Sequence, residues 1–295
     1  MLWMREHPDL ARAALARTTT TLPSTLAAKF DRHMAMLQRQ YDLPTVRRLV
    51  GDARIDLFGC LQATVLLNRF NYAPRPLVQS YTAYTERLRR ANEAFYLGAG
   101  APAFVLMDSC AIDGRVPTGD DGYALLAILR GWQPAAVEKN LLLMRRAPTA
   151  AVAPVPAAAC PCTQVARGEW ISVPGNGAPM LMHVRYDLSL AGRLRAFALS
   201  EPMLALEVQL ANGESTTYRL PRNIAAGGFL VSPMLADTQA YLAWYFNQQR
   251  SPVVRVRLVA ESAAQESLFA AGIEYGFAPI AIPDAAARGQ KAPEP

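Results

Sequence analysis

One segment organises the chain: Phe70-Asn71-Tyr72-Ala73-Pro74-Arg75-Pro76-Leu77-Val78-Gln79-Ser80-Tyr81-Thr82-Ala83-Tyr84-Thr85. Each proline fixes its own φ and disfavours helix at the residue before it, so Ala73 and Arg75 are held extended. Residues 76–80 then predict a short buried strand, followed by a polar, aromatic exit and a helix from Glu86. Open α/β folds place ligand contacts where strands leave the sheet through such loops. The alternative is a rigid turn whose tyrosines only pack.

The residues on either side of this segment alternate between strand and helix patterns. Residues 103–107 are continuously apolar, as expected of a strand that is covered on both faces. This alternation predicts a mostly parallel α/β sheet domain over residues 50–146, with right-handed crossovers. The other expected strands are 54–58 and 140–144, and the expected helices are 61–70, 85–97 and one from Asp120 or Asp121 to Trp132.

A helical lead-in is expected over residues 1–49. Its main helix carries an apolar stripe with a 3.6-residue period and ends before Pro44. The stripe consists of Leu26, Phe30, Met34, Leu37 and Tyr41.

Composition and period change in the second half of the chain. Residues 147–163 are rich in Ala, Pro and Val and predict an extended linker. From 164 to 283 the apolar residues repeat with period two, which predicts an antiparallel β-sandwich of jelly-roll type. Residues 284–295 predict a disordered tail. The expected strands are 169–173, 180–187, 193–199, 204–210, 215–220, 228–232, 252–259 and 271–281, with one helix over 237–246.

The composition bounds the class of protein. The chain has 295 residues, is 52% hydrophobic and carries a formal net charge of +6. Its positive charge is almost entirely arginine scattered along the chain, whereas nucleic-acid binding favours clustered basic residues among aromatics. We therefore expect no nucleic-acid partner. No apolar run reaches membrane-spanning length and no export signal is visible at the N-terminus.

Neither a cofactor nor a metal is expected. The chain has no phosphate-binding loop, no G-x-S-x-G elbow and only three histidines. Its four cysteines are Cys60, Cys110, Cys160 and Cys162, a spacing that is poor for structural zinc. A disulfide is possible, but the sequence does not show which cysteines would form it. For Cys60 and Cys110 we favour buried or idle free thiols.

A second polar segment, 108–117, follows the apolar strand 103–107 and should leave the sheet at the same edge as residues 79–84. Tyrosine faces beside Asp, Gln and Arg groups suit sugars, although other polar ligands would fit. The predicted ligand-binding residues are Arg75, Gln79, Tyr81, Tyr84, Asp113 and Arg115. Alternatively, Asp113 could form an acid/base pair with Asp120 or Asp121, as in glycosidases. A third interpretation is structural, with a turn at Asp113, a helix cap at Asp120 or Asp121 and an ion pair at Arg115.

Several short motifs carry a resemblance. They are Asn71-Tyr72-x-Pro74-Arg75-Pro76, Gln79-Ser80-Tyr81-x-Ala83-Tyr84-Thr85, Asn92, Ala101-Pro102 and Ile112-Asp113-Gly114-Arg115-x-Pro117. Residues 50–146 resemble a segment of bacterial polytopic membrane proteins related in layout to the GT-C membrane glycosyltransferases. In those proteins the segment follows the membrane spans, lies outside the cytoplasm and precedes a β-rich region. This chain departs from the pattern because it shows no spans.

The resemblance implies a periplasmic or otherwise extracytoplasmic setting and transfers no catalytic residue. We therefore expect a non-catalytic domain that recognises a glycan or scaffolds a membrane glycosyltransferase-like partner, whose membrane region could be encoded upstream. Two alternatives stay open. One is a carbohydrate-active hydrolase or transferase that uses Asp113 with Asp120 or Asp121, and the other is a purely structural spacer.

Overall fold

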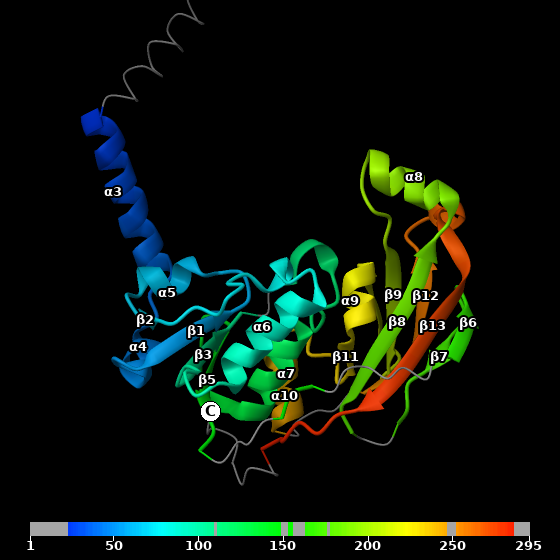
Figure 1. The fold of residues 1–295 in the computed structure, drawn as a ribbon. Helices are drawn as coiled ribbons and strands as arrows, with labels where there is room; N and C mark the ends of the chain where they lie inside the picture. Colours follow the sequence, from blue (N-terminus) through cyan, green and yellow to red (C-terminus); the bar gives the residue numbers. More distant parts are fainter. Residues whose placement is uncertain are drawn as a thin grey trace, which may run out of the picture.

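The computed structural model describes residues 23–108, 111–148, 153–155, 163–175, 178–246 and 252–285, and it is a mixed helix-and-sheet structure (Figure 1). The predictions for the first 22 residues, most of the linker, most of the tail, and Cys110, Cys160 and Cys162 lie outside these residues. None of the helices in the described part is long and apolar enough to cross a membrane.

The first sheet is mixed rather than mostly parallel, which corrects the prediction. Strand β1 runs parallel to β2 and β3, while β5 is antiparallel to both β3 and β4. Lys139 and Asn140 both have positive φ, 49° and 63°. Two such residues form the tight turn that joins antiparallel strands, so β4 and β5 make a hairpin. The strand order is β2(Asn71–Tyr72)-β1(Arg54–Phe58)-β3(Phe104–Met107)-β5(Leu141–Arg146)-β4(Trp132–Glu138).

The strand predicted over residues 76–80 is wrong. The chain makes only the two-residue strand β2 and then turns, because Pro74 and Pro76 have no N–H to donate to a neighbouring strand. The Leu77 N–H instead donates to the Asn92 side chain, at 2.9 Å. The helical elements of this half are α4(Pro44–Val50), α5(Ala63–Leu67), η1(Ser80–Thr82), α6(Glu86–Leu97), η2(Ile112–Gly114) and α7(Gly122–Gly131).

The predicted N-terminal helix is present as α3(Pro23–Gln40), and it stands away from the rest of the molecule (Figure 1). The apolar side chains in its first half are largely uncovered, with Leu26 and Phe30 more than half exposed, whereas Met34 and Leu37 nearer its end are partly buried. The period of the stripe therefore predicted the helix correctly, but only its last part, where Lys139 donates to the Gln40 carbonyl, meets the rest of the described chain.

Two antiparallel sheets form the second half. Side chains from both sheets, including Met182, Val184, Leu206 and Val256, share one core. One sheet has the order β10(Ser215–Leu220)-β9(Leu204–Leu210)-β12(Val253–Ala260)-β7(Ile171–Ser172), and the other β11(Phe229–Ser232)-β8(Met180–Leu188)-β13(Phe269–Pro279)-β6(Thr163–Ala166).

The strand predicted over 193–199 is wrong because these residues lie in helix α8(Leu190–Ala198). Ser189 begins the helix, and its side chain accepts a hydrogen bond from the Gly192 N–H. The remaining helical elements are α9(Arg222–Gly227), α10(Thr238–Tyr245) and η3(Ala263–Leu268).

The two halves are packed against each other. Leu126 and Leu129 of α7 share a buried cluster with Leu230 of β11 and with Tyr241 and Tyr245 of α10. Figure 1 shows α7 and α10 side by side between the first sheet and the antiparallel sheets. The first sheet is therefore connected to the second half through a common apolar core.

Candidate functional site

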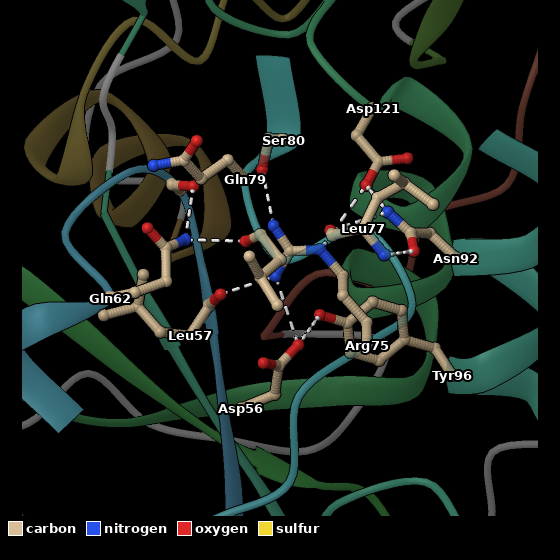
Figure 2. Close-up of polar contacts among 12 residues, drawn as sticks. Asp56, Leu57, Gln62, Arg75, Leu77, Gln79, Ser80, Asn92, Tyr96 and Asp121 are labelled. Carbon is tan, nitrogen blue, oxygen red and sulfur yellow. Dashed lines mark hydrogen bonds and ion pairs between the residues drawn. The ribbon is translucent and has the colours of Figure 1, made fainter. Parts of the chain in front are cut away.

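Arg75, the central residue of the proline segment, is enclosed in the first half of the molecule (Figure 2). Only 1% of the residue is exposed. Its Nη1 lies 3.1 Å from Asp56 Oδ2, its Nε lies 3.5 Å from Asp121 Oδ2, and its Nη2 donates to Ser80 Oγ at 2.9 Å. Nη1 also donates to the Leu57 carbonyl. This side chain connects β1, η1 and the start of α7.

A second layer of polar groups surrounds this arginine. The Tyr96 hydroxyl donates to Asp56 Oδ2 at 2.5 Å, and the Asn92 amide donates to Asp121 Oδ2 at 2.6 Å. The Asn92 side chain also exchanges hydrogen bonds with both backbone groups of Leu77. Helix α6 therefore holds the proline segment against the sheet by buried hydrogen bonds, which are costly to break.

Two carboxylates share one guanidinium in this network. Burial raises the pKa of Asp121 to about 7, although the nearby Arg75 lowers it. Burial also raises the pKa of Asp56, again opposed by Arg75. A buried carboxylate prefers to be neutral unless its charge is fully compensated, and here Arg75, with a smaller contribution from Arg89, does not outweigh the burial of Asp121. The network therefore tends to take up a proton near neutral pH.

A small cleft opens beside the network at the ends of β1 and β3. It is lined by Ser80, Asp108, Asp120 and Asp237 among others, and it has a volume of about 40 Å³. That space suits a few water molecules and is much smaller than ordinary ligand pockets, roughly 300 Å³ and upward. The cleft cannot hold a sugar ring in this conformation.

Two carboxylates of the cleft are perturbed. Burial raises the pKa of Asp120 to about 6 despite the nearby Arg115, and burial also raises the pKa of Asp108. Asp108 accepts a hydrogen bond from the Cys60 N–H at 3.2 Å, whereas Asp120 Oδ2 has no hydrogen-bond partner among the described residues. The cleft therefore presents one carboxyl group poised to titrate near physiological pH.

The structure brings the two polar segments to the same edge of the sheet but does not gather the six predicted ligand-binding residues there. Ser80 from the first segment and Asp108 and Pro117 from the second line the cleft, but none of the six predicted residues does. Arg75 is enclosed in the network. The other five predicted residues lie near the cleft or at the surface.

Gln79 and Tyr81 pair with each other, the Tyr81 hydroxyl donating to Gln79 Oε1. Tyr84 is 54% exposed. Arg115 lies between Asp113, at 3.8 Å, and Asp120, at 3.6 Å. A ligand-binding role for these residues stays a prediction, and for Arg75 it would require Ser80 to move.

Both polar segments also contact the second half of the molecule. The Val116 N–H donates to the Arg219 carbonyl at 3.2 Å, and the Thr118 hydroxyl donates to the Leu230 carbonyl. The Arg89 guanidinium donates to the Asn223 carbonyl at 3.0 Å, and the Asn223 amide to the Tyr84 carbonyl at 3.2 Å. The sequence analysis considered a structural role for both segments, but it did not predict these contacts with the second half.

The aspartates of the predicted acid/base pairs differ in their burial. Asp121 is fully buried against Arg75, and Asp113 is exposed. Asp121 also precedes α7 at the capping position, but with a left-handed φ of 54° and no side-chain cap bond. Its side chain points to Arg75 and Asn92 instead. Of these aspartates only Asp120 lines the cleft.

The sequence reasoning missed Asp56 and Tyr96. A signal was available for Asp56, because an acidic residue inside the otherwise apolar strand Ile55-Asp56-Leu57 requires a buried partner. The prediction of an idle thiol at Cys60 is also wrong, because this cysteine is disulfide-bonded. The other three cysteines lie outside the described residues.

A larger groove lies on the second half, between α10 and strands β9 and β10. Its volume is about 440 Å³, within the range of small-molecule sites. The apolar part of its wall includes Val208, Met234 and Trp244. The turn that joins β9 to β10 supplies Asn212 and Glu214 as polar groups, and β10 itself supplies Thr216 and Tyr218.

The tryptophans of this half differ in their surroundings. Trp244 belongs to the buried cluster shared by the two halves. Trp170 is only partly buried, and the guanidinium groups of Arg255 and Arg257 lie 4.3 and 4.5 Å from its ring centre. It stacks on the strand surface rather than anchoring a core.

Comparisons with known proteins add little to what the geometry of the site shows. No protein-family model matches the chain, and no curated protein matches it. A solved structure of AlgX from Pseudomonas aeruginosa aligns with 79% of this chain and 50% of its own, at 10% identity and a TM-score of 0.28. The chain thus spans half the length of that protein, and a likeness this weak carries no argument about fold or function.

Proposed function

We propose that the chain is a non-catalytic, extracytoplasmic binding domain that recognises a glycan. The observation that carries the proposal is the groove between α10 and the β9–β10 hairpin, about 440 Å³ in volume. A sugar needs an apolar surface for its C–H faces together with fixed donors and acceptors for its hydroxyls. The groove combines both kinds of surface, whereas the cleft at the sheet edge is too small for a sugar ring.

The polar groups of the groove are held in place by local contacts. The Asn212 amide donates to Glu214 Oε2 at 2.8 Å, and the Glu214 N–H donates to Asn212 Oδ1 at 3.0 Å. The hairpin that follows β9 is therefore preorganised, which reduces the entropy lost on binding. Non-catalytic recognition fits this site better than hydrolysis, because Glu214 is the only acidic residue among the described residues that line it.

Two features support a setting outside the cytoplasm. Cys60 is disulfide-bonded, and disulfides persist mainly in oxidising compartments. The resemblance of residues 50–146 to a segment of GT-C-like membrane proteins points the same way and suggests a membrane glycosyltransferase-like protein as partner. In this proposal the two antiparallel sheets serve as a jelly-roll-like β-sandwich, an architecture that is common among lectins.

Titration with soluble oligosaccharides of neutral, acidic and amino-sugar classes, followed by calorimetry, tests the proposal. We expect binding by at least one class, weakened roughly tenfold or more by Tyr218→Ala, since aromatic side chains dominate such contacts. Trp170→Ala is the matched control, because this aromatic residue lines no part of the groove. Absence of binding by every class, or equal losses in the two variants, would count against glycan recognition at this groove.

A hydrolase or transferase is the second candidate, favoured by one observation: Asp120, with a pKa raised to about 6, lines a cleft beside Ser80 and Asp108. Its test is turnover of chromogenic glycosides and esters by the wild type and by Asp120→Asn. Turnover that disappears in this variant would favour catalysis over the binding domain proposed above.

A further inference from the structure

Helix α8 has its small side chains inward and its large ones outward, the reverse of an ordinary surface helix. Gly192 and the half-buried Ala196 face the body of the protein. An atom added at the Cβ position of Gly192 would lie 2.0 Å from the Leu268 carbonyl oxygen. The helix therefore lies directly against η3, and no large side chain is used to hold it there.

The outward side of α8 carries an exposed apolar stripe. Leu190, Leu194 and Phe197 follow the spacing i, i+4, i+7 and are 76%, 62% and 94% exposed, and Leu199, which follows the helix, is 80% exposed. Residues at this spacing share one face of a helix. Monomeric proteins rarely expose such a contiguous apolar patch without a binding partner.

Two arginines flank the stripe. At 100° per residue, Arg193 lies directly beside the stripe, and Arg195 lies on its other side, 100° beyond Leu194 and past the small side chain of Ala198. Neither guanidinium forms an ion pair within the described part of the chain. Nearby acidic groups are already paired, Asp187 and Glu201 with Arg222 and Glu266 with Arg167. The face thus presents apolar side chains bordered by cations that are free to attract negative charge.

We propose that α8 docks onto the surface of a bilayer containing anionic phospholipids. An apolar face edged with Lys or Arg is the arrangement by which helices lie in a membrane interface, with the apolar side chains among the acyl chains and the cations at the phosphates. Figure 1 shows α8 across one end of the antiparallel sheets, away from the first sheet, so a planar surface can reach it.

The size of the patch favours a lipid surface over a second copy of the chain. Three apolar side chains on a nine-residue helix, with Leu199 just after it, offer much less than the roughly 800 Å² per partner of a stable protein interface. Attraction to anionic lipids adds to the apolar term without requiring a complementary protein surface. This inference goes beyond the proposed glycan recognition and does not depend on the groove.

Co-sedimentation of the full chain with vesicles tests the inference. Vesicles of phosphatidylcholine with 30% phosphatidylglycerol, roughly the anionic share of many membranes, are compared with vesicles of pure phosphatidylcholine. We expect the partition coefficient to be at least about tenfold higher on the anionic vesicles. The variant Arg193→Gln/Arg195→Gln should reduce it to the level seen on the neutral vesicles.

The apolar stripe is tested with matched aspartate variants. Leu194→Asp and Phe197→Asp should each lower the partition coefficient about tenfold or more. Leu66→Asp in α5 and Phe30→Asp in α3 change apolar residues that are exposed to the same degree as Leu194, 64% and 62%, and should leave binding within about twofold. All six positions are on the surface, so circular dichroism should show unchanged folding.

Three results would overturn the inference. The first is no binding of the wild type to anionic vesicles. The second is a loss in Phe30→Asp as large as that in Phe197→Asp. The third is a lipid-free dimer in sedimentation velocity that Phe197→Asp dissociates, because the stripe would then be an interface between copies.

Discussion

At the scale of single residues, the most consequential arrangement is the sharing of Arg75 between Asp56 and Asp121. All three side chains are fully buried. A buried ion pair contributes little over an apolar replacement, but removal of one partner leaves an uncompensated charge in a poorly polarisable interior. The network therefore makes the first half of the molecule sensitive to single substitutions and to pH.

Arg75→Met should lower the free energy of unfolding by about 3–5 kcal/mol, because both carboxylates lose their cation. Urea denaturation followed by circular dichroism measures the change. Arg87→Met, on the exposed side of α6, is the matched control and should shift stability by less than about 0.5 kcal/mol. Adding Asp56→Asn and Asp121→Asn to Arg75→Met should recover part of the loss. A loss below about 1 kcal/mol in Arg75→Met would show that the network is not a stabilising unit.

Asp121→Asn should change how stability depends on pH. The pKa of Asp121 is about 7 in the folded chain against an ordinary value of 3.8, so between these limits the folded state binds more protons than the unfolded state. The free energy of unfolding of the wild type should therefore fall as the pH rises from about 4 to about 7. Asparagine cannot titrate, and its carbonyl can still accept a hydrogen bond from Asn92. The part of the pH dependence of stability that is due to Asp121 should therefore vanish in this variant.

Urea titrations at several pH values measure this effect. The stability of the wild type relative to Asp121→Asn should decline by up to about 4 kcal/mol across that window, at about 1.4 kcal/mol per unit of pKa shift. Asp113→Asn is the control, because that carboxylate is exposed, and it should leave the slope unchanged. A parallel pH dependence in wild type and Asp121→Asn would rule out Asp121 as the titrating group.

The sequence indicated which residues around Arg75 carry chemistry, but not where they face. Arginine is rarely buried, so a prediction from residue type places it in solvent at a loop. Its burial depends on Asp56, which lies 19 residues earlier, and on Asp121, much later in the chain. Only the folded sheet brings these groups together, and a pattern within one segment cannot show that.

At the scale of elements, local signals succeeded where capping or period was unambiguous. The strands at 54–58, 204–210 and 215–220 are confirmed with their predicted bounds. Residues 193–199 failed because Arg193, Leu194 and Arg195 alternate like a strand, while the helix depends on the Ser189 cap and on the contact of Gly192 with Leu268. That contact is tertiary, so the period of a short segment could not reveal it.

Gly192→Ala tests that contact. In an exposed helix this substitution would stabilise by about 1 kcal/mol, but here the new methyl group would meet the Leu268 carbonyl at 2.0 Å. We expect a net loss of at least about 1 kcal/mol in the free energy of unfolding, in line with the cost of overpacking. Gly272→Ala in β13 is the control, since nothing lies within 4 Å of its added methyl group, and it should be nearly neutral. A stabilised Gly192→Ala protein would mean that α8 is not seated against η3.

At the scale of the whole molecule, the two halves predicted from composition are not independent in their packing. Leu181, Leu230 and the aromatic residues of α10 complete the apolar cluster around α7. Val116, from the first half, is buried in the core shared by the antiparallel sheets. The compositional change near 147–163 predicted a boundary because composition reflects only local chain preferences, and the contacts between the two halves depend on side chains far apart in sequence.

This reciprocal packing predicts one cooperative unfolding transition for the full chain. If either half unfolded alone, it would expose Tyr241, Tyr245 and the α7 leucines to water, and each such side chain is worth about 1.5–3 kcal/mol when buried. We expect coincident urea transitions by far-ultraviolet circular dichroism and tryptophan fluorescence, and a calorimetric enthalpy equal to the van't Hoff enthalpy.

The variant Tyr245→Ala, in the second half, should shift both signals together by about 3 kcal/mol or more, because a large buried aromatic side chain is removed. The exposed Tyr84→Ala provides the matched control and should shift neither by more than about 1 kcal/mol. Two resolved transitions, only one of which responds to Tyr245→Ala, would mean that the halves are separate folding units joined by a weak interface.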